Sequence, residues 1–199
     1  FGYAPGRGGT HAENLYAGIR EGAVLMSDGY EVYNGIAHSH RLIHLGCWAH
    51  ARRYFVEAEA VLPKAARRPD QLATQFIAAI ARLYAVEAKV KGKGVAERAQ
   101  LREASSRSIL AEIQHLLVTH RHSVTPGSLL GKALHYLEAQ WPKLIRYVEN
   151  GAWPIDNNLC ENAIRPFVVG RRNWLFADTA AGANGSANIY SLIETCKAN

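Results

Sequence analysis

Acidic, amide and basic side chains concentrate near the end of this sequence, where residues 153–176 read WPIDNNLCENAIRPFVVGRRNWLF. Asn157 lies four residues before Glu161, and Arg165 lies four residues after it. In a helix this spacing places the three side chains on one face. The plain alternative is a surface ion pair of Glu161 with Arg165, which contributes little to stability. The density of polar groups favours a functional face.

A second candidate acid, Asp28, follows the apolar run AVLM and a serine, and precedes Gly29. The run predicts a buried strand that ends in a loop, which is where α/β sheets place their ligands. Taken alone, Asp28 is more typical of a turn aspartate. Paired with Glu161 it forms two carboxylates from distant segments, which repel each other unless a cation lies between them. Magnesium is the cation that such oxygen ligands select.

Three zones of the chain must position these acids. Residues 1–62 mix strand patterns (AVLMS, RLIHLGC) with the helical pattern WAHARRYFVEAEAVL, and residues 63–150 carry apolar side chains at helical spacing throughout. Residues 151–199 return to loops and polar residues. We therefore predict an α/β core, formed by 1–62 and 151–199, that carries 63–150 as a large all-helical insertion.

Local signals predict the ends of several elements. Thr10 and Glu13 have the spacing of a capping box, and Asp156 is a natural N-cap for the helix that carries Glu161. The segments GRRNWLFAD and AAGANGSA are expected as a short strand or loop and as a loop, and ANIYSLIETCKAN as a closing helix.

Composition adds a broad constraint on partners and location. The chain has 199 residues, a formal net charge of +6 and a pI of about 9.3, which favours a polyanionic partner. No apolar stretch is long enough to cross a bilayer. Three scattered cysteines predict no disulfide framework, so we expect a cytoplasmic protein without a membrane partner.

Four segments, in this order, carry a resemblance to a known family: MSDGYEVYN, CWAHARRYF, IDNNLCENAIRPFVVGRRNWLF and IYSLIETCKAN. Together they resemble the catalytic core of bacterial insertion-sequence transposases of the IS66 family. The resemblance implies a ribonuclease-H-like fold with an Asp-Asp-Glu triad that binds two Mg²⁺ ions, for which Mn²⁺ can substitute. It assigns Asp28 as the second aspartate and Glu161 as the glutamate.

The implied activity is metal-dependent cleavage and transfer of DNA strands. Two metal ions activate the attacking oxygen and stabilise the leaving oxygen. The expected partners are the DNA ends of the insertion sequence and the target DNA, with a homo-oligomer in the full-length protein. Arg165, Arg171 and Arg172 are candidate phosphate contacts.

Three further residues are expected to flank the reaction centre: His50, Asp156 and Asn157. Cys47 and His50 lie one helical turn apart. Two such ligands do not make a zinc site. The interpretation is a buried cysteine beside a histidine that faces the reaction centre.

One departure from the family pattern leaves an alternative open. In the family the first aspartate precedes a segment like FGYAPGR, with which this sequence begins. The expectation is a fragment whose core is incomplete at its N-terminus and which alone cleaves no DNA. The alternative is a catalytically inactive DNA-binding remnant of a transposase. A helical protein-interaction module is a third reading, disfavoured by the ordered motifs at both ends.

Overall fold

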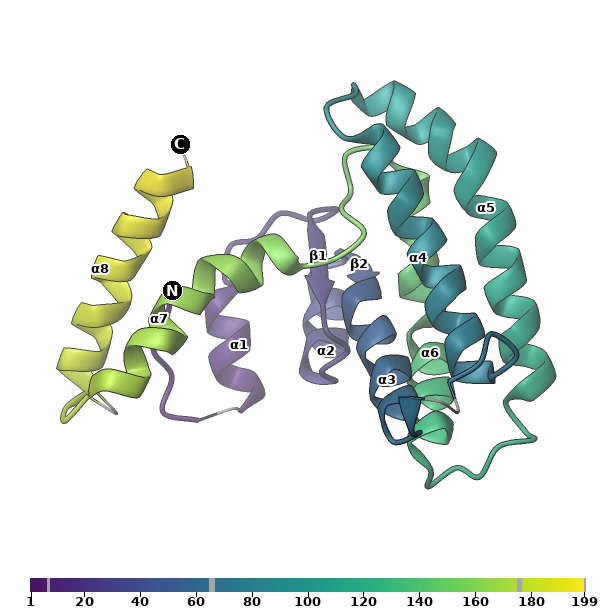
Figure 1. The fold of residues 1–199 in the computed structure, drawn as a ribbon. Helices are drawn as coiled ribbons and strands as arrows, with labels where there is room; N and C mark the ends of the chain where they lie inside the picture. Colours follow the sequence, from purple (N-terminus) through teal and green to yellow (C-terminus); the bar gives the residue numbers. More distant parts are fainter. Residues whose placement is uncertain (7, 65–66, 175–176, 199) are drawn as a thin grey trace. The chain divides into compact units, whose positions relative to one another are not determined.

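The computed structural model describes residues 1–6, 8–64, 67–174 and 177–198, without the side chains of 171–174 and 198. Helices dominate it, and two short strands, β1 and β2, pair in a parallel sheet (Figure 1). In chain order the elements are α1 (Gly9–Leu15), β1 (Val24–Ser27), α2 (Val32–Ser39), β2 (Ile43–Gly46), α3 (Trp48–Ala60), α4 (Leu72–Val90), α5 (Val95–His120), α6 (Leu129–Leu144), the 3₁₀ helix η2 (Ile145–Glu149), α7 (Asn158–Trp174) and α8 (Ala180–Ala198).

The chain divides into two compact units, each described below by itself. The helical unit comprises residues 24–29 and 44–156, and the terminal unit comprises 1–23, 30–43 and 157–199. Helices α4, α5, α6 and η2 match the helical pattern predicted for the middle of the chain. The predicted division into core and insertion stays a prediction.

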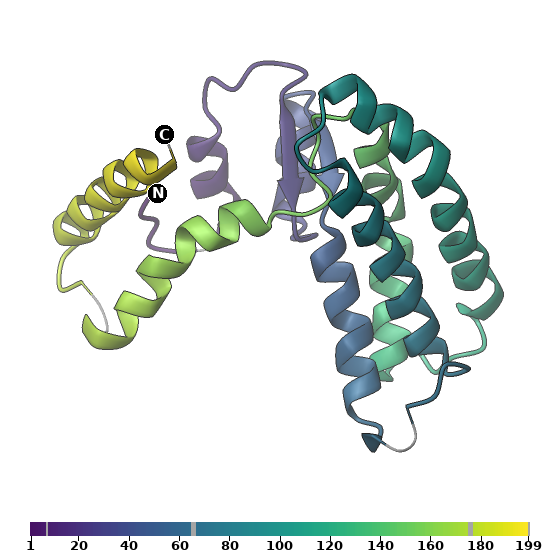
Figure 2. The same cartoon turned by 45° about the horizontal axis from the view of Figure 1, so that its top comes forward.

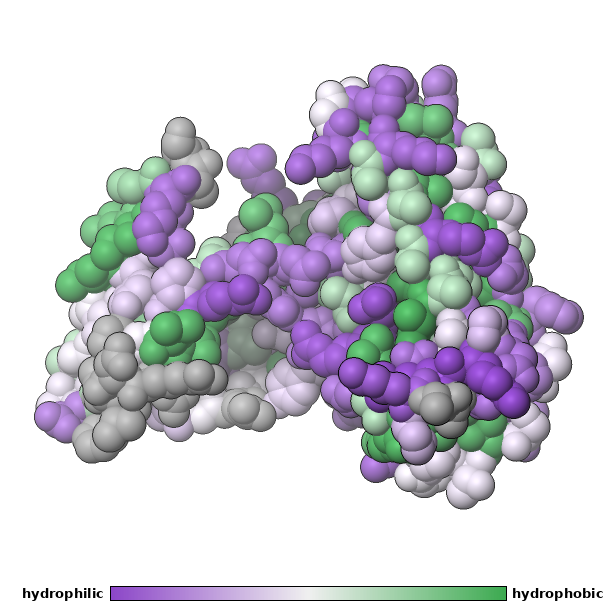
Figure 3. All heavy atoms as spheres, viewed as in Figure 1, coloured by the Kyte–Doolittle hydropathy of each residue, from purple (hydrophilic) through white to green (hydrophobic). Residues whose placement is uncertain are grey.

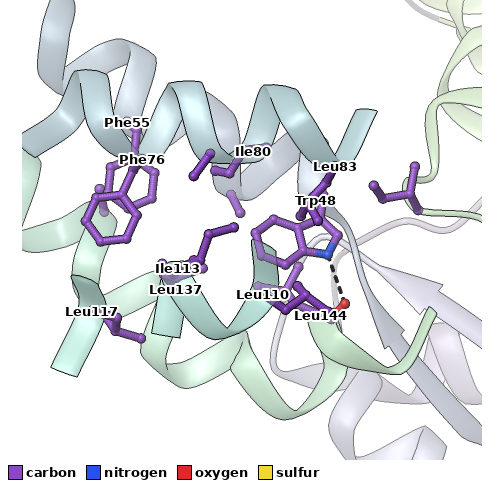
Figure 4. Close-up of a cluster of buried hydrophobic side chains, with 14 of the residues drawn as sticks. Trp48, Phe55, Phe76, Ile80, Leu83, Leu110, Ile113, Leu117, Leu137 and Leu144 are labelled. Atoms are coloured by element: carbon purple, nitrogen blue, oxygen red, sulfur yellow. Dashed lines mark hydrogen bonds between the residues drawn. The ribbon is translucent and has the colours of Figure 1, made fainter. Parts of the chain in front are cut away.

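The core of the helical unit lies between α3, α4, α5 and α6, which run alongside one another in both ribbon views (Figures 1 and 2). Its buried members include Phe76 of α4, Ile113 of α5 and Leu134 of α6, which lie in the segments where apolar side chains were predicted at helical spacing, and residues of α3. Phe55 of α3 stacks on Phe76 of α4 with ring centroids 4.4 Å apart (Figure 4). Trp48, fully buried, donates from Nε1 to the carbonyl of Leu144 at 2.9 Å (Figure 4). This bond satisfies the one polar atom of a large apolar side chain.

One charged residue, Arg102 of α5, is also buried in this unit. Its guanidinium donates to both carboxylate oxygens of Glu87 at 2.8 and 2.7 Å. It also donates to the carbonyls of Tyr147 and Asn150, each at 2.9 Å. These carbonyls lie at the end of η2, so Arg102 terminates this helix and joins it to α4 and α5.

The segment that leaves the core after η2 is held closely. Gly151 packs against α5 so tightly that a Cβ there would lie 1.9 Å from the carbonyl oxygen of Val95. Ile155 is buried, and its carbonyl accepts the backbone N–H of Trp48 at 3.1 Å. Packing against the helical unit therefore fixes the chain as far as Ile155, a few residues before α7 begins.

In the terminal unit, α7 and α8 meet through aromatic side chains. The rings of Phe167 and Tyr190 pack edge to face with centroids 5.2 Å apart, and Phe1 lies within 6.2 Å of both. Helix α8 carries exposed apolar side chains, and Figure 3 shows green surface along this helix. The exposed apolar residues of α8 include Ile189, Leu192 and Ile193.

Several predictions of element ends are wrong in this unit. Helix α7 continues past Pro166 and through the backbone of residues 171–174, where a strand or loop was expected. Helix α8 begins at Ala180, so the glycine-containing AAGANGSA segment is helical, and only the closing helix was foreseen. Trp174 ends α7, but its side chain lies outside the described part of the chain.

The predicted helix starts are also displaced. Helix α1 begins at Gly9 with Gly8 as its N-cap, so Thr10 lies inside the helix and no capping box forms. Helix α7 begins at Asn158, which gives the N-cap position to Asn157 instead of Asp156.

None of the helices in the described ranges has the length and apolar character needed to span a membrane.

Candidate functional site

Asp28 lies in a turn directly after β1, as the sequence predicted. Its side chain is exposed, whereas the preceding residue, Ser27, is buried. Gly29 has a φ of 97°, a left-handed conformation that favours glycine. The chain bends there, and the side chain of Asp28 lies exposed at the carboxyl end of a parallel strand.

Helix α6 contacts this turn through two side chains. The hydroxyl of Tyr136 donates to the carbonyl oxygen of Asp28 at 2.6 Å. Burial raises the pKa of the Tyr136 phenol, so the hydroxyl keeps its proton and remains a donor. Gln140, which is buried, packs against Gly29.

Behind the turn, the two strands are joined by a buried hydrogen bond between Ser27 and His44, with Oγ and Nε2 2.8 Å apart. Burial, and to a smaller extent the nearby cations Lys143 and Arg146, lower the pKa of His44 to about 4. His44 is therefore neutral at physiological pH and links β1 to β2 without carrying charge.

Glu161 lies in the first turn of α7 and is half-buried. A carboxylate in this position is favoured by the partial positive charge at a helix N-terminus. Arg165 follows one turn later and is exposed. Arg171 and Arg172 lie on the last turns of the same helix, but their side chains are outside the described part of the structure.

The residues before α7 make contacts that the sequence did not predict, and their place beside the reaction centre stays a prediction. Asp156 accepts a hydrogen bond from the hydroxyl of Tyr84 at 2.8 Å. Burial, together with this bond, raises the pKa of Tyr84, which keeps the phenol protonated. Asn157 is half-buried, and its carbonyl accepts the backbone N–H of Glu161 at 3.1 Å. Asp156 therefore joins α4 to the segment that leads into α7.

Cys47 and His50 lie at the start of α3. Cys47 is the N-cap residue and is fully buried, and His50 is half-buried in the first turn. Across the residues that the structure describes, no three His, Cys, Asp or Glu side chains are grouped as a metal site requires. Asp28, Asp156 and His50 belong to the helical unit, whereas Asn157, Glu161 and Arg165 belong to the terminal unit. The convergence of Asp28 with Glu161 stays a prediction.

No local sequence pattern identifies the partners of Tyr84, Tyr136 and Gln140. All three lie on helices whose apolar stripes account for most of their sequence pattern. Tyrosines on a helix that is otherwise apolar on one face are a weak signal, because a buried hydroxyl needs a partner. The identity of that partner is set by the tertiary fold.

Comparison with known proteins identifies the family. The sequence profile described as "Transposase IS66 family" matches residues 1–185. An uncharacterized protein of Sinorhizobium fredii, y4qI, is 33% identical over 99% of this chain and 36% of its own length. A second uncharacterized protein of that organism, y4hP, is 28% identical over 97% of this chain and 36% of its own length.

The chain thus spans little more than a third of the curated relatives that it matches. No solved structure matches it significantly. The match to the family profile runs from the first residue through α7 and into α8, and so includes both candidate acids, Asp28 and Glu161. On this evidence the chain belongs to the IS66 family of transposases.

Proposed function

We propose that this chain is the catalytic segment of a DNA transposase, which cleaves DNA strands at the ends of an insertion sequence and transfers them to a target. The observation that carries the proposal is the exposed carboxylate of Asp28 on a fixed turn at the end of β1. Sheet-based enzymes place ligand-binding side chains at this position. The proposed fold of the complete core is ribonuclease-H-like.

Asp28 and Glu161 are the proposed metal ligands. Their donor atoms are carboxylate oxygens, which suit Mg²⁺ or Mn²⁺ and are poor ligands for softer metals. When bound, a pair of such ions would supply charge stabilisation for the attacking and leaving oxygens of the phosphodiester. Both acids have features suited to this role, because Asp28 is accessible and Glu161 sits in the first turn of a helix.

The basic side chains of α7 are proposed to bind the DNA backbone. Arg165 is exposed one turn beyond Glu161, and Arg171 and Arg172 follow on the same helix. Arginine pairs with phosphate through two parallel hydrogen bonds, so these residues would hold the DNA in register beside the acids. Phosphate contacts carry no sequence information, so recognition of specific DNA ends would need other parts of the protein.

The experiment is a strand-cleavage assay on the full-length protein with DNA from the ends of its own element. Glu161→Gln keeps the size of the side chain and removes its charge. We expect loss of cleavage with DNA affinity retained, and the same result for Asp28→Asn. Glu13→Gln is a matched control, because Glu13 is an exposed acid of the same unit as Glu161. Cleavage at the wild-type rate by the Glu161→Gln variant would refute the assignment, and a wild-type protein that binds but never cuts would identify an inactive remnant.

A further inference from the structure

The turn that carries Asp28 is held by side chains of α6, outside the sequence motif to which Asp28 belongs. The shortest contact is the hydrogen bond of 2.6 Å from the hydroxyl of Tyr136 to the backbone carbonyl of Asp28. Without such a donor, a carbonyl in an exposed turn would bond to water and could change its orientation. Here it has a fixed donor that is 108 residues away in sequence.

The ring of Tyr136 is itself held in place. Tyr54 of α3 stacks on it with ring centroids 4.5 Å apart and planes inclined by 28°. This stack limits rotation of the Tyr136 side chain, so its hydroxyl has little freedom to leave the carbonyl. Two helices of the helical unit, α3 and α6, thereby fix one donor atom.

Gly29 shows that the space around the turn is filled. A methyl group at this position would lie 3.0 Å from Cδ of Gln140 and 3.1 Å from Cε2 of Tyr136. Gln140 is buried, and its Oε1 accepts a hydrogen bond from Nζ of Lys143 at 2.8 Å. The backbone next to Asp28 is therefore packed directly against α6.

We infer that Tyr136 is a positioning residue for the metal-binding carboxylate of Asp28. This inference rests on the proposed function. A carboxylate ligand binds a divalent cation more tightly when its backbone does not have to be ordered on binding. Tyr136 orders that backbone in advance, which gives the helices of this unit a direct role at the catalytic acid.

The variant that tests this role is Tyr136→Phe, which keeps the ring and its stack and removes only the hydroxyl. We expect Mn²⁺, titrated into the protein and followed by electron paramagnetic resonance, to bind about fivefold more weakly, as the loss of one hydrogen bond predicts. The ¹⁵N order parameters of Asp28 and Gly29 should fall below those of the flanking strand. Tyr54→Phe, which alters the other ring of the stack, should leave Mn²⁺ affinity unchanged.

Asp28→Asn separates failure of this inference from failure of the proposed function. If Asp28→Asn weakens Mn²⁺ binding and Tyr136→Phe does not, the positioning role of Tyr136 is overturned and the metal assignment stands. If Asp28→Asn has no effect on Mn²⁺ binding, the metal assignment is overturned. In that event the order parameters of the Tyr136→Phe variant decide what remains. Unchanged values would show that Tyr136 does not order the turn either, and lowered values would show that Tyr136 orders the turn but has no role in metal binding.

Discussion

The hydroxyl of Ser27 and Nε2 of His44 meet at 2.8 Å across the two strands, one residue before the turn of Asp28. Both side chains are buried, and the cations Lys143 and Arg146 lie nearby. The imidazole is therefore kept neutral in the folded protein, with its pKa lowered to about 4 from the ordinary value of 6.5.

This lowered pKa makes the stability of the fold depend on pH. Between about pH 6.5 and pH 4 the unfolded chain binds a proton at His44 and the folded chain does not. The free energy of unfolding should therefore decrease as the pH falls through this window, by roughly 3 kcal/mol in total from this residue. Above pH 6.5 His44 is neutral in both states and contributes no pH dependence.

Urea unfolding at a series of pH values measures this effect. His44→Gln should flatten the curve between pH 6.5 and pH 4, whereas His135→Gln, an exposed position on α6, should leave it unchanged. An equally steep curve in the His44→Gln variant would show that other groups cause the acid sensitivity.

Arg102 should contribute far more to stability than a surface arginine. Arg102→Ala leaves the half-buried carboxylate of Glu87 and two carbonyls of the η2 region without their donor, so we expect a loss of roughly 3–5 kcal/mol. Arg107 on the same helix has an exposed ion pair with Glu103, and Arg107→Ala should cost less than about 1 kcal/mol. Chemical denaturation of both variants checks the difference, and similar losses would contradict it.

Gly151 should tolerate no side chain. The carbonyl oxygen of Val95 and the amide nitrogen of Ala99 occupy the space of a Cβ, at 1.9 and 2.9 Å, and both are backbone atoms that cannot move independently of α5. We expect Gly151→Ala to lower the melting temperature and to cost about 2 kcal/mol or more. Gly127→Ala, with no atom within 4 Å of the added methyl, is the matched control and should be close to neutral. Equal melting temperatures for the two variants would mean that Gly151 packs less closely against α5 than the structure shows.

Removal of the Arg165 side-chain charge should lower the salt sensitivity of DNA binding. If Arg165 neutralises one phosphate, Arg165→Gln should reduce the slope of log affinity against log salt by about 0.9. Fluorescence anisotropy with a short duplex at several salt concentrations measures this slope. Arg68→Gln, at an exposed position of the helical unit where the arginine is paired with Asp70, should leave the slope unchanged. An unaltered slope in the Arg165→Gln variant would remove this residue from the DNA contacts.

The strand that ends just before Asp28 could be predicted because its signal is local. An apolar run followed by a polar residue and a glycine can be read without knowledge of the rest of the fold. The buried stripes of α4 to α6 could be predicted for the same reason, since Phe76, Ile113 and Leu134 recur with their neighbours at helical spacing.

Helices α7 and α8 could not be bounded in this way, because tertiary contacts override local preference there. Pro166 removes one backbone donor from α7, yet Phe167 in the next position packs against Tyr190 of α8. The glycines of α8 disfavour a helix, but the hydroxyl of Thr179 accepts the N–H of Gly182 at 3.0 Å and caps its first turn. The contacts of Tyr84 and Tyr136 likewise join positions far apart in sequence, so no local pattern encodes them.

The main core cluster draws all its buried side chains from residues between Trp48 and Ile155. A ribosome that has just added Ile155 has therefore already made every member of that cluster, and chains synthesised at about 5–20 residues per second give helices ample time to form. Glu161 is made only afterwards. The sequence of the core cluster is therefore complete before Glu161, the last acid of the proposed catalytic set, is added to the chain.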